Sequence, residues 1–115
     1  MNKELLIEGI KKLGMETTEE QIERFSKYSE LLREWNNKIN LTAITDDDGI
    51  SVKHFLDSIL PLAHIEIKTG ANIADVGTGA GFPGLPIKII RDDINLTLID
   101  SLNKRINFLT LVSNE

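Results

Sequence analysis

The chain has 115 residues, a formal net charge of −5 and no cysteine. This length suits one small domain or part of a larger one. The lack of cysteine excludes disulfides and thiolate metal sites, and it is typical of a cytoplasmic protein. No run of 18 apolar residues is present, so we expect no membrane-spanning helix. The acidic balance argues mildly against nucleic-acid binding through bulk charge, but it does not exclude a local basic patch.

The first 67 residues are expected to form an N-terminal helical region. Residues 2–13 carry apolar side chains on one side, as a short amphipathic helix does. A capping box follows, formed either by Thr18 with Gln21 or by Thr17 with Glu20. Apolar residues then recur at every third or fourth position, which predicts a long amphipathic helix.

A third helix is expected at about residues 49–60, ended by Pro61. The acidic run Asp46–Asp48 precedes it and favours a helix N-terminus through the helix dipole. A metal site in this run is disfavoured because the EF-hand spacing is absent. His54 and Asp57 share one face of the predicted helix, where the residues alone favour a hydrogen-bonded pair.

Residues 68–115 have a different pattern, typical of the start of a doubly wound α/β domain. Short apolar segments at 71–76 and 94–99 predict two buried parallel strands. Helices are predicted at 81–91, with prolines tolerated in the first turn, and from residue 104 to the end of the chain.

A glycine-rich segment at residues 75–84 joins the first predicted strand to its helix. A phosphate-binding P-loop is strongly disfavoured, because Leu85-Pro86 stands where that motif needs lysine and a hydroxyl residue. The dinucleotide fingerprint fits at Gly77 and Gly79 but fails at its third glycine, where Phe82 stands. These mismatches disfavour a P-loop NTPase and a NAD-binding domain.

The same segment matches a third pattern, acid-x-G-x-G-x-G, at Asp75, Gly77, Gly79 and Gly81. This pattern is typical of loops that bind S-adenosylmethionine (SAM). SAM carries a sulfonium and an ammonium, so a nearby carboxylate attracts it, whereas a pyrophosphate would be repelled. Asp100 ends the second strand, where an acid can accept ribose hydroxyls. The alternative is that these are turn glycines and a helix cap in an unrelated α/β protein.

Over about residues 20–110 the chain resembles the RsmG family, also called GidB, of bacterial 16S ribosomal RNA methyltransferases. The matching segments are Trp35-Asn36 with Asn40-Leu41-Thr42, His54-Phe55-Leu56-Asp57-Ser58, Asp75 through Pro86, and Asp100-Ser101-Leu102-Asn103-Lys104-Arg105 with Phe108-Leu109. The resemblance implies an N-terminal helical segment followed by the first β-α-β-α part of a truncated, Rossmann-like methyltransferase domain.

The resemblance also implies an activity and site residues. The activity is methyl transfer from SAM to N7 of a guanine in 16S rRNA, within the small ribosomal subunit. The implied cofactor residues are Asp75 near the methionine end, Gly77, Gly79, Gly81 and Phe82 along the loop, Asp100 at the ribose and Ser101 beside the adenosine. His54, Lys104 and Arg105 are candidates for RNA contact, although two basic residues on an exposed helix are as readily explained by solvation. Guanine N7 has a lone pair and no proton, so the transfer needs positioning and electrostatics but no general base.

Only two strands are predicted, whereas an open doubly wound sheet usually has about six. We therefore expect an N-terminal fragment that is inactive alone and self-associates through exposed strand edges. A naturally short protein that takes a strand from a partner is the alternative. Two other functions remain open: a small-molecule methyltransferase, and a non-catalytic interaction module in which the helices are the working part.

Overall fold

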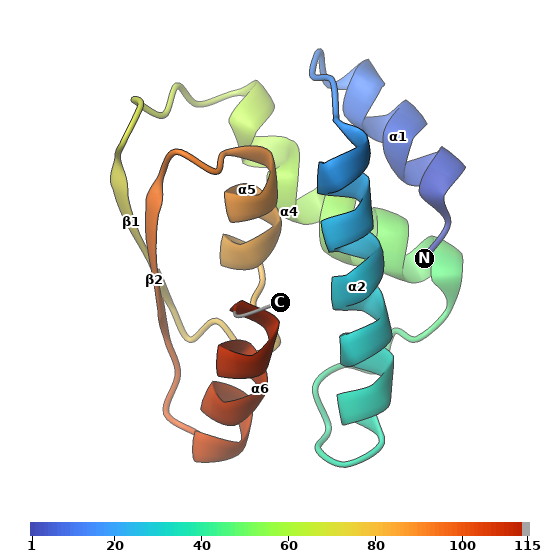
Figure 1. Cartoon of the computed structure of the whole chain (residues 1–115), viewed down its shortest axis with the longest axis vertical. Coiled ribbons are helices and arrows are strands. Elements are labelled where there is room, and N and C mark those ends of the chain that lie inside the picture. Colours follow the sequence, from blue (N-terminus) through green and yellow to red (C-terminus); the bar gives the residue numbers. More distant parts are fainter. Residues whose placement is uncertain (114–115) are drawn as a thin grey trace.

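The computed structural model describes residues 1–113, with helices packed on one face of a two-stranded parallel sheet (Figure 1). The elements are α1 (Lys3–Lys12), α2 (Glu19–Asn36), α3 (Asp47–Gly49), η1 (Ile50–Leu56), α4 (Asp57–Ile59), η2 (Leu60–Ala63), β1 (Asn72–Val76), α5 (Gly84–Ile90), β2 (Asn95–Ile99) and α6 (Asn103–Ser113). This order confirms the predicted α/β class. The predicted continuation of the last helix over 114–115 lies outside the described residues. None of the helices in residues 1–113 is both long and apolar enough to span a membrane.

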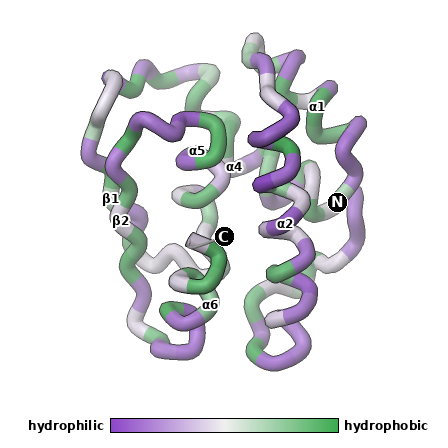
Figure 2. Tube along the Cα trace, viewed as in Figure 1, coloured by the Kyte–Doolittle hydropathy of each residue, from purple (hydrophilic) through white to green (hydrophobic). Residues whose placement is uncertain are grey.

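The long helix α2 begins at a complete capping box, and the residues that form it are Thr18 and Gln21. The Thr18 hydroxyl accepts the Gln21 N–H at 3.1 Å, and the Gln21 side chain accepts the Thr18 N–H at 2.9 Å. Along α2, hydrophilic and hydrophobic segments alternate as an amphipathic helix requires (Figure 2). The helix ends one turn before its apolar periodicity does. The side chain of Asn36 there accepts the N–H groups of Leu41 and Thr42, which turns the chain away from the helix axis.

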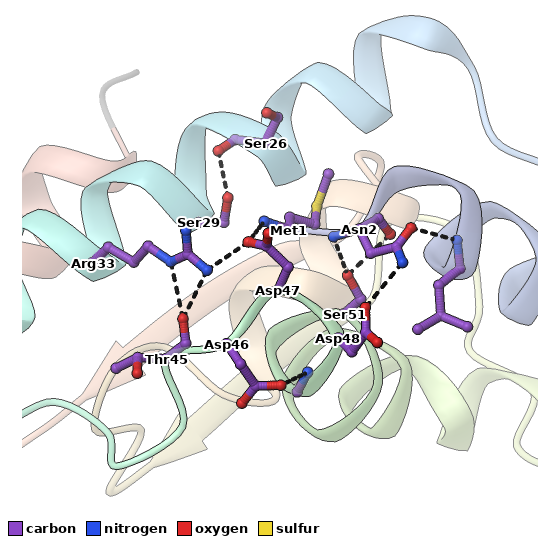
Figure 3. Close-up of polar contacts among 12 residues, drawn as sticks. Met1, Asn2, Ser26, Ser29, Arg33, Thr45, Asp46, Asp47, Asp48 and Ser51 are labelled. Atoms are coloured by element: carbon purple, nitrogen blue, oxygen red, sulfur yellow. Dashed lines mark hydrogen bonds and ion pairs between the residues drawn. The ribbon is translucent and has the colours of Figure 1, made fainter.

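The acidic run Asp46–Asp48 joins the N-terminus and α2 to the start of the next helix (Figure 3). Its first carboxylate accepts the Gly49 N–H at 2.8 Å and caps α3. The second pairs with the amino group of Met1 at 2.6 Å and with Arg33, and the third accepts from the Asn2 side chain at 2.9 Å. Each carboxylate of the run therefore has a structural partner.

Residues 47–63 form one continuous helix of mixed geometry, in place of the plain helix predicted at 49–60. Its middle, η1, is π-helical, and the Asp57 N–H donates to the carbonyl of Val52 five residues earlier. The sequence predicts that Pro61 ends the helix, but Pro61 lies inside the final 3₁₀ turn η2. A proline fits there because Pro61 is the second residue of this 3₁₀ segment, whose first turn needs no N–H from it.

One hydrophobic core joins the residues on both sides of position 67. Phe25 of α2 packs on Phe55 of η1, with ring centroids 4.9 Å apart. The ring centroids of Trp35 in α2 and Phe108 in α6 lie 6.0 Å apart, and buried Leu85 of α5 belongs to the same cluster. Burial of such large rings contributes about 1.5–3 kcal/mol each. The helices of the first half therefore stabilise the loop and strands of the second.

Among residues 1–113, helices cover only one face of the sheet (Figure 1). β1 and β2 pair in parallel register, from Asn72 opposite Asn95 to Val76 opposite Ile99. α5 and α6 lie between the sheet and α2 (Figure 1). On the opposite face Val76 is 76% exposed and Ile99 46% exposed. The prediction of strands buried on both faces is therefore wrong for residues 1–113, because no described element covers that face.

Candidate cofactor-binding site

The glycine loop, defined here as residues 77–83, leaves β1 and bends over the C-terminal end of β2. The N–H groups of Gly77 and Thr78 both donate to the carbonyl of Ile99, at 2.7 and 3.1 Å. The loop thus lies at the carboxyl ends of both strands, where ligands of parallel α/β sheets bind. α5 begins at Gly84, later than the predicted residue 81, because the last residues of the loop form a turn.

The three glycines of the motif have left-handed backbone angles. The φ values are +70° at Gly77, +61° at Gly79 and +103° at Gly81, a region that side chains disfavour. A Cβ at Gly77 or Gly79 would meet no atom within 4 Å, so the outer side of the loop is open. A Cβ at Gly81 would lie 2.6 Å from both Leu85 Cδ1 and Tyr28 Oη. The first two glycines permit close approach of a ligand, and the third permits close packing on the helices.

Asp75, at the end of β1, holds the loop and the start of α5 together. Its Oδ2 atom accepts the Thr78 hydroxyl at 2.7 Å and the Gly84 N–H at 2.9 Å. A carboxylate therefore stands at the N-terminus of α5, where a dinucleotide-binding fold would place its pyrophosphate. The negative charge makes this position unsuitable for a phosphate and favourable for a cation.

Asp100, at the end of β2, closes the other side of the loop. Its Oδ2 accepts the Gly79 N–H at 2.9 Å, and its Oδ1 accepts the Leu102 N–H at 3.0 Å. The Leu102 N–H has the larger effect in lowering the pKa of Asp100, followed by the Gly79 N–H. The Arg105 guanidinium, 3.6 Å from Oδ2, also lowers this pKa. The Asp100 side chain is 2% exposed. A ribose can reach this carboxylate only if the atoms that cover it move.

The remaining candidates after β2 fall into two groups. Ser101, just before α6, and Lys104, in its first turn, are exposed, so they are accessible to a ligand or to RNA. Arg105 is half-buried, and its guanidinium faces Asp100. Lys104 is therefore exposed to solvent, whereas Arg105 is directed to Asp100 beside the glycine loop.

Sequence reasoning missed Tyr28, which lies on α2 but acts on the loop. Its buried hydroxyl donates to the carbonyl of Ala80, and its ring stacks on Phe82 with centroids 5.6 Å apart. Burial, and then the negative charge of Asp75, raise the pKa of Tyr28 well above its usual value. The available signal was chemical, because a tyrosine in an apolar stripe needs a partner for its hydroxyl.

His54 lies beside the loop, and its hydrogen-bond partner is not the predicted one. Its Nε2 atom is 2.7 Å from the Thr42 hydroxyl, whereas Asp57 acts on it only through charge. The predicted His54–Asp57 pair is therefore wrong, because the segment between α2 and α3 brings Thr42 to the ring. The imidazole stacks on Phe82 with centroids 4.4 Å apart and planes 8° from parallel. Burial lowers the pKa of His54, and the charge of Asp57 opposes that shift.

Two hollows flank these elements, and the larger is not at the glycine loop. It measures about 920 Å³, lies between α2, α5 and α6, and is lined by neither Asp75, Asp100 nor any loop glycine. The smaller, about 460 Å³, is bordered by His54 and Phe82. Proximity to the motif, rather than size, therefore identifies the candidate site.

Comparison with known proteins places this arrangement in a family. The family model described as "GidB: rRNA small subunit methyltransferase G" matches residues 21–115, which include the whole glycine loop and Asp100. The chain belongs to this family.

Curated members of the GidB family resemble the chain from end to end. A protein named ribosomal RNA small subunit methyltransferase G from Clostridium beijerinckii is 53% identical over 96% of this chain and 46% of its own length. Proteins of the same name from Lysinibacillus sphaericus and Exiguobacterium sibiricum are 51% and 47% identical over 100% of this chain and 48% of theirs. The chain spans about half the length of the curated relatives it matches.

Proposed function

We propose that this chain forms the first part of the SAM site of a methyltransferase that acts on N7 of a guanine in 16S rRNA. Membership of the GidB family and the names of its curated relatives support an rRNA substrate. The observation that carries the choice of cofactor is the carboxylate of Asp75, 2.9 Å from the Gly84 N–H at the start of α5. This acid favours a cationic ligand over a pyrophosphate.

The residues present fit SAM in three respects. The outer sides of Gly77 and Gly79 are open, so a ligand can contact the backbone there. Each oxygen of Asp100 accepts one hydrogen bond and has a second lone pair, which a ribose hydroxyl can use once the atoms that cover the carboxylate move. Exposed Ser101 follows directly and can lie beside the adenosine.

Methyl transfer to guanine N7 needs little acid–base catalysis from residues of this chain. Bound SAM would supply an electrophilic methyl group: as the N7 lone pair of guanine forms the new bond to carbon, the methyl–sulfonium bond would break and the neutral thioether would leave, with no proton lost from N7. The protein must therefore hold the two reactants in line and stabilise the changing charge. We assign exposed Lys104 to contact with RNA phosphate, with Arg105, whose guanidinium faces Asp100, and His54 as further candidates. We place the reaction at the small ribosomal subunit in the cytoplasm.

Isothermal titration of the 115-residue chain with SAM tests the cofactor assignment. We expect binding that Gly77→Arg abolishes, because the arginine would occupy the open side of the loop. The matched control is Gly70→Arg, since Gly70 also has open space and a φ of +74° but precedes β1, at the opposite end of the strand. Binding of NAD⁺ in place of SAM would overturn the assignment.

The substrate needs a second experiment on a protein that contains this chain and has the length of its relatives. We expect it to transfer labelled methyl groups from SAM to 16S rRNA, and the 115-residue chain alone to transfer none. SAM binding without affinity for RNA would favour a small-molecule methyltransferase. Loss of SAM binding in the longer protein would favour a non-catalytic interaction module.

A further inference from the structure

His54 is fixed in two independent ways, although it lies outside the glycine motif. Its ring plane is set by Phe82, on which it stacks at 4.4 Å and 8°. Its rotation within that plane is set by the Thr42 hydroxyl, 2.7 Å from Nε2. Thr42 is itself held, because its oxygen also accepts the Ile44 N–H at 3.0 Å. An aromatic ring held from both directions is a rigid support for its neighbour.

The neighbour it supports is the only aromatic side chain of the glycine loop. Phe82 lies between His54 on one side and Tyr28 on the other, at centroid distances of 4.4 and 5.6 Å. Tyr28 also donates to the carbonyl of Ala80 two residues earlier. The C-terminal half of the loop is thus positioned by α2 and η1, which come from the first half of the chain.

The chemistry of His54 exceeds what packing alone requires. A leucine would fill a half-buried site beside a phenylalanine without a polar atom that needs a partner. A planar ring with a hydrogen-bonding edge can both stack on Phe82 and bond to Thr42, whereas leucine can do neither. The residue types at these positions therefore suit the orientation of a ring more than the filling of a space.

We propose that His54, oriented by Thr42, is a positioning residue for cofactor binding. It fixes the ring of Phe82 and thereby holds the glycine loop in the conformation in which Asp100 accepts the Gly79 N–H. The inference rests on the proposed function, because it assigns the benefit to SAM. The path from the Phe82 ring to the bond between Gly79 and Asp100 is short. Phe82 and Gly81 both donate their N–H groups to the carbonyl of Thr78, within the same turn that presents Gly79 to Asp100.

Amide hydrogen exchange followed by NMR tests the effect on the loop without any ligand. The reporters are the N–H groups of Gly81 and Phe82, and the internal standard is the Arg91 N–H, which bonds to Ile87 in α5. In Thr42→Val, which keeps the shape of the side chain but removes the hydroxyl, we expect exchange at both reporters to quicken roughly fivefold, as loss of one hydrogen bond allows. Exchange at Arg91 stays as in the wild type.

Two further variants separate positioning from folding. Thr42→Ser retains the hydroxyl and is expected to exchange as the wild type does. His54→Leu keeps an apolar contact but loses the ring and the hydrogen bond, and we expect roughly tenfold faster exchange at the reporters. His64→Leu is its matched control, because His64 is the other histidine and is exposed beyond η2. Equal acceleration at Arg91 would mean general destabilisation and would overturn the positioning role.

Titration of the same variants with SAM tests the effect on the cofactor. We expect Thr42→Val and His54→Leu to weaken SAM binding about fivefold and tenfold, in proportion to loop exchange, and Thr42→Ser and His64→Leu to leave it unchanged. Wild-type affinity in His54→Leu would overturn the inference and leave the proposed function intact. If loop exchange quickens as expected but neither this chain nor the longer protein binds SAM, the proposed function is overturned, and with it the cofactor role of His54.

Discussion

The carboxylate of Asp100 accepts the backbone N–H of Gly79 at 2.9 Å, and this bond joins the end of β2 to the middle of the glycine loop. The same side chain also accepts the Leu102 N–H at the start of the next segment. One acid therefore fixes the loop after β1 and the turn after β2. The residue expected to bind ribose is also the residue that closes the loop, so ligand binding and loop shape are coupled through Asp100.

Removal of this carboxylate is expected to destabilise the fold. Asp100→Ala leaves the N–H groups of Gly79 and Leu102 without their acceptor, and loss of hydrogen bonds to a charged group costs about 1.5–3 kcal/mol. Asp100→Asn keeps one acceptor oxygen and should lose less. The measurement is the free energy of unfolding in urea. Asp92→Ala is the control, because the Asp92 carboxylate is exposed and forms only surface ion pairs, with Arg24 at 3.6 Å and Lys88 at 3.9 Å, each worth at most about 1 kcal/mol. An Asp100→Ala variant as stable as Asp92→Ala would contradict the closing role.

The stability of the chain is expected to fall as the solution is acidified below the usual histidine pKa. Burial lowers the pKa of folded His54 below 6.5, with Asp57 opposing the shift. The unfolded chain therefore binds a proton first, and stability present above pH 6.5 is lost as the pH falls toward the folded pKa. Urea midpoints measured from about pH 7.5 down to about pH 5 follow this loss. His54→Gln should flatten the profile, and His64→Gln should leave it as it is. A profile unchanged by His54→Gln would refute the assignment.

Local patterns were enough to predict the elements that carry the candidate site. Short apolar segments and glycine punctuation predicted the strands, and β1 and β2 lie within one residue of the predicted ranges. The capping box at Thr18 marked the start of α2 because its hydrogen bonds are local, three residues apart. The acid at the end of each strand was predicted from position alone, and both acids do contact the loop.

The missed features depend on contacts between residues distant in sequence. Tyr28 bonds to a carbonyl 52 residues away, and helical periodicity reports only that its side chain faces the core. His54 was paired with Asp57 because helical spacing places them on one face, but Thr42 reaches the ring from another segment. The π-helical turns of η1 also have no local signature in Ile50–Leu56.

The capping box of α2 gives a direct test of which threonine starts the helix. Thr18→Ala removes the acceptor of the Gln21 N–H and should lower the free energy of unfolding by about 1 kcal/mol. Thr17→Ala is the matched control, since Thr17 belongs to the alternative box that the structure does not form. Urea unfolding monitored by circular dichroism measures both. Equal losses in the two variants would show that the cap at Thr18 is not what stabilises the helix.

The 115-residue chain is expected to self-associate through its uncovered sheet. Val76 and Ile99 are exposed neighbours in the β1–β2 register, so their side chains form one apolar surface next to unpaired strand edges. Burial of such a surface against a second copy is favourable by about 25 cal/mol per Å². Val76→Lys should shift sedimentation velocity profiles toward the monomer. Val52→Lys is the control, because Val52 is also an exposed valine but lies on η1, away from the sheet. A wild-type chain that sediments as a monomer over a broad concentration range would contradict this prediction, and an equal response to Val52→Lys would move the interface away from the sheet.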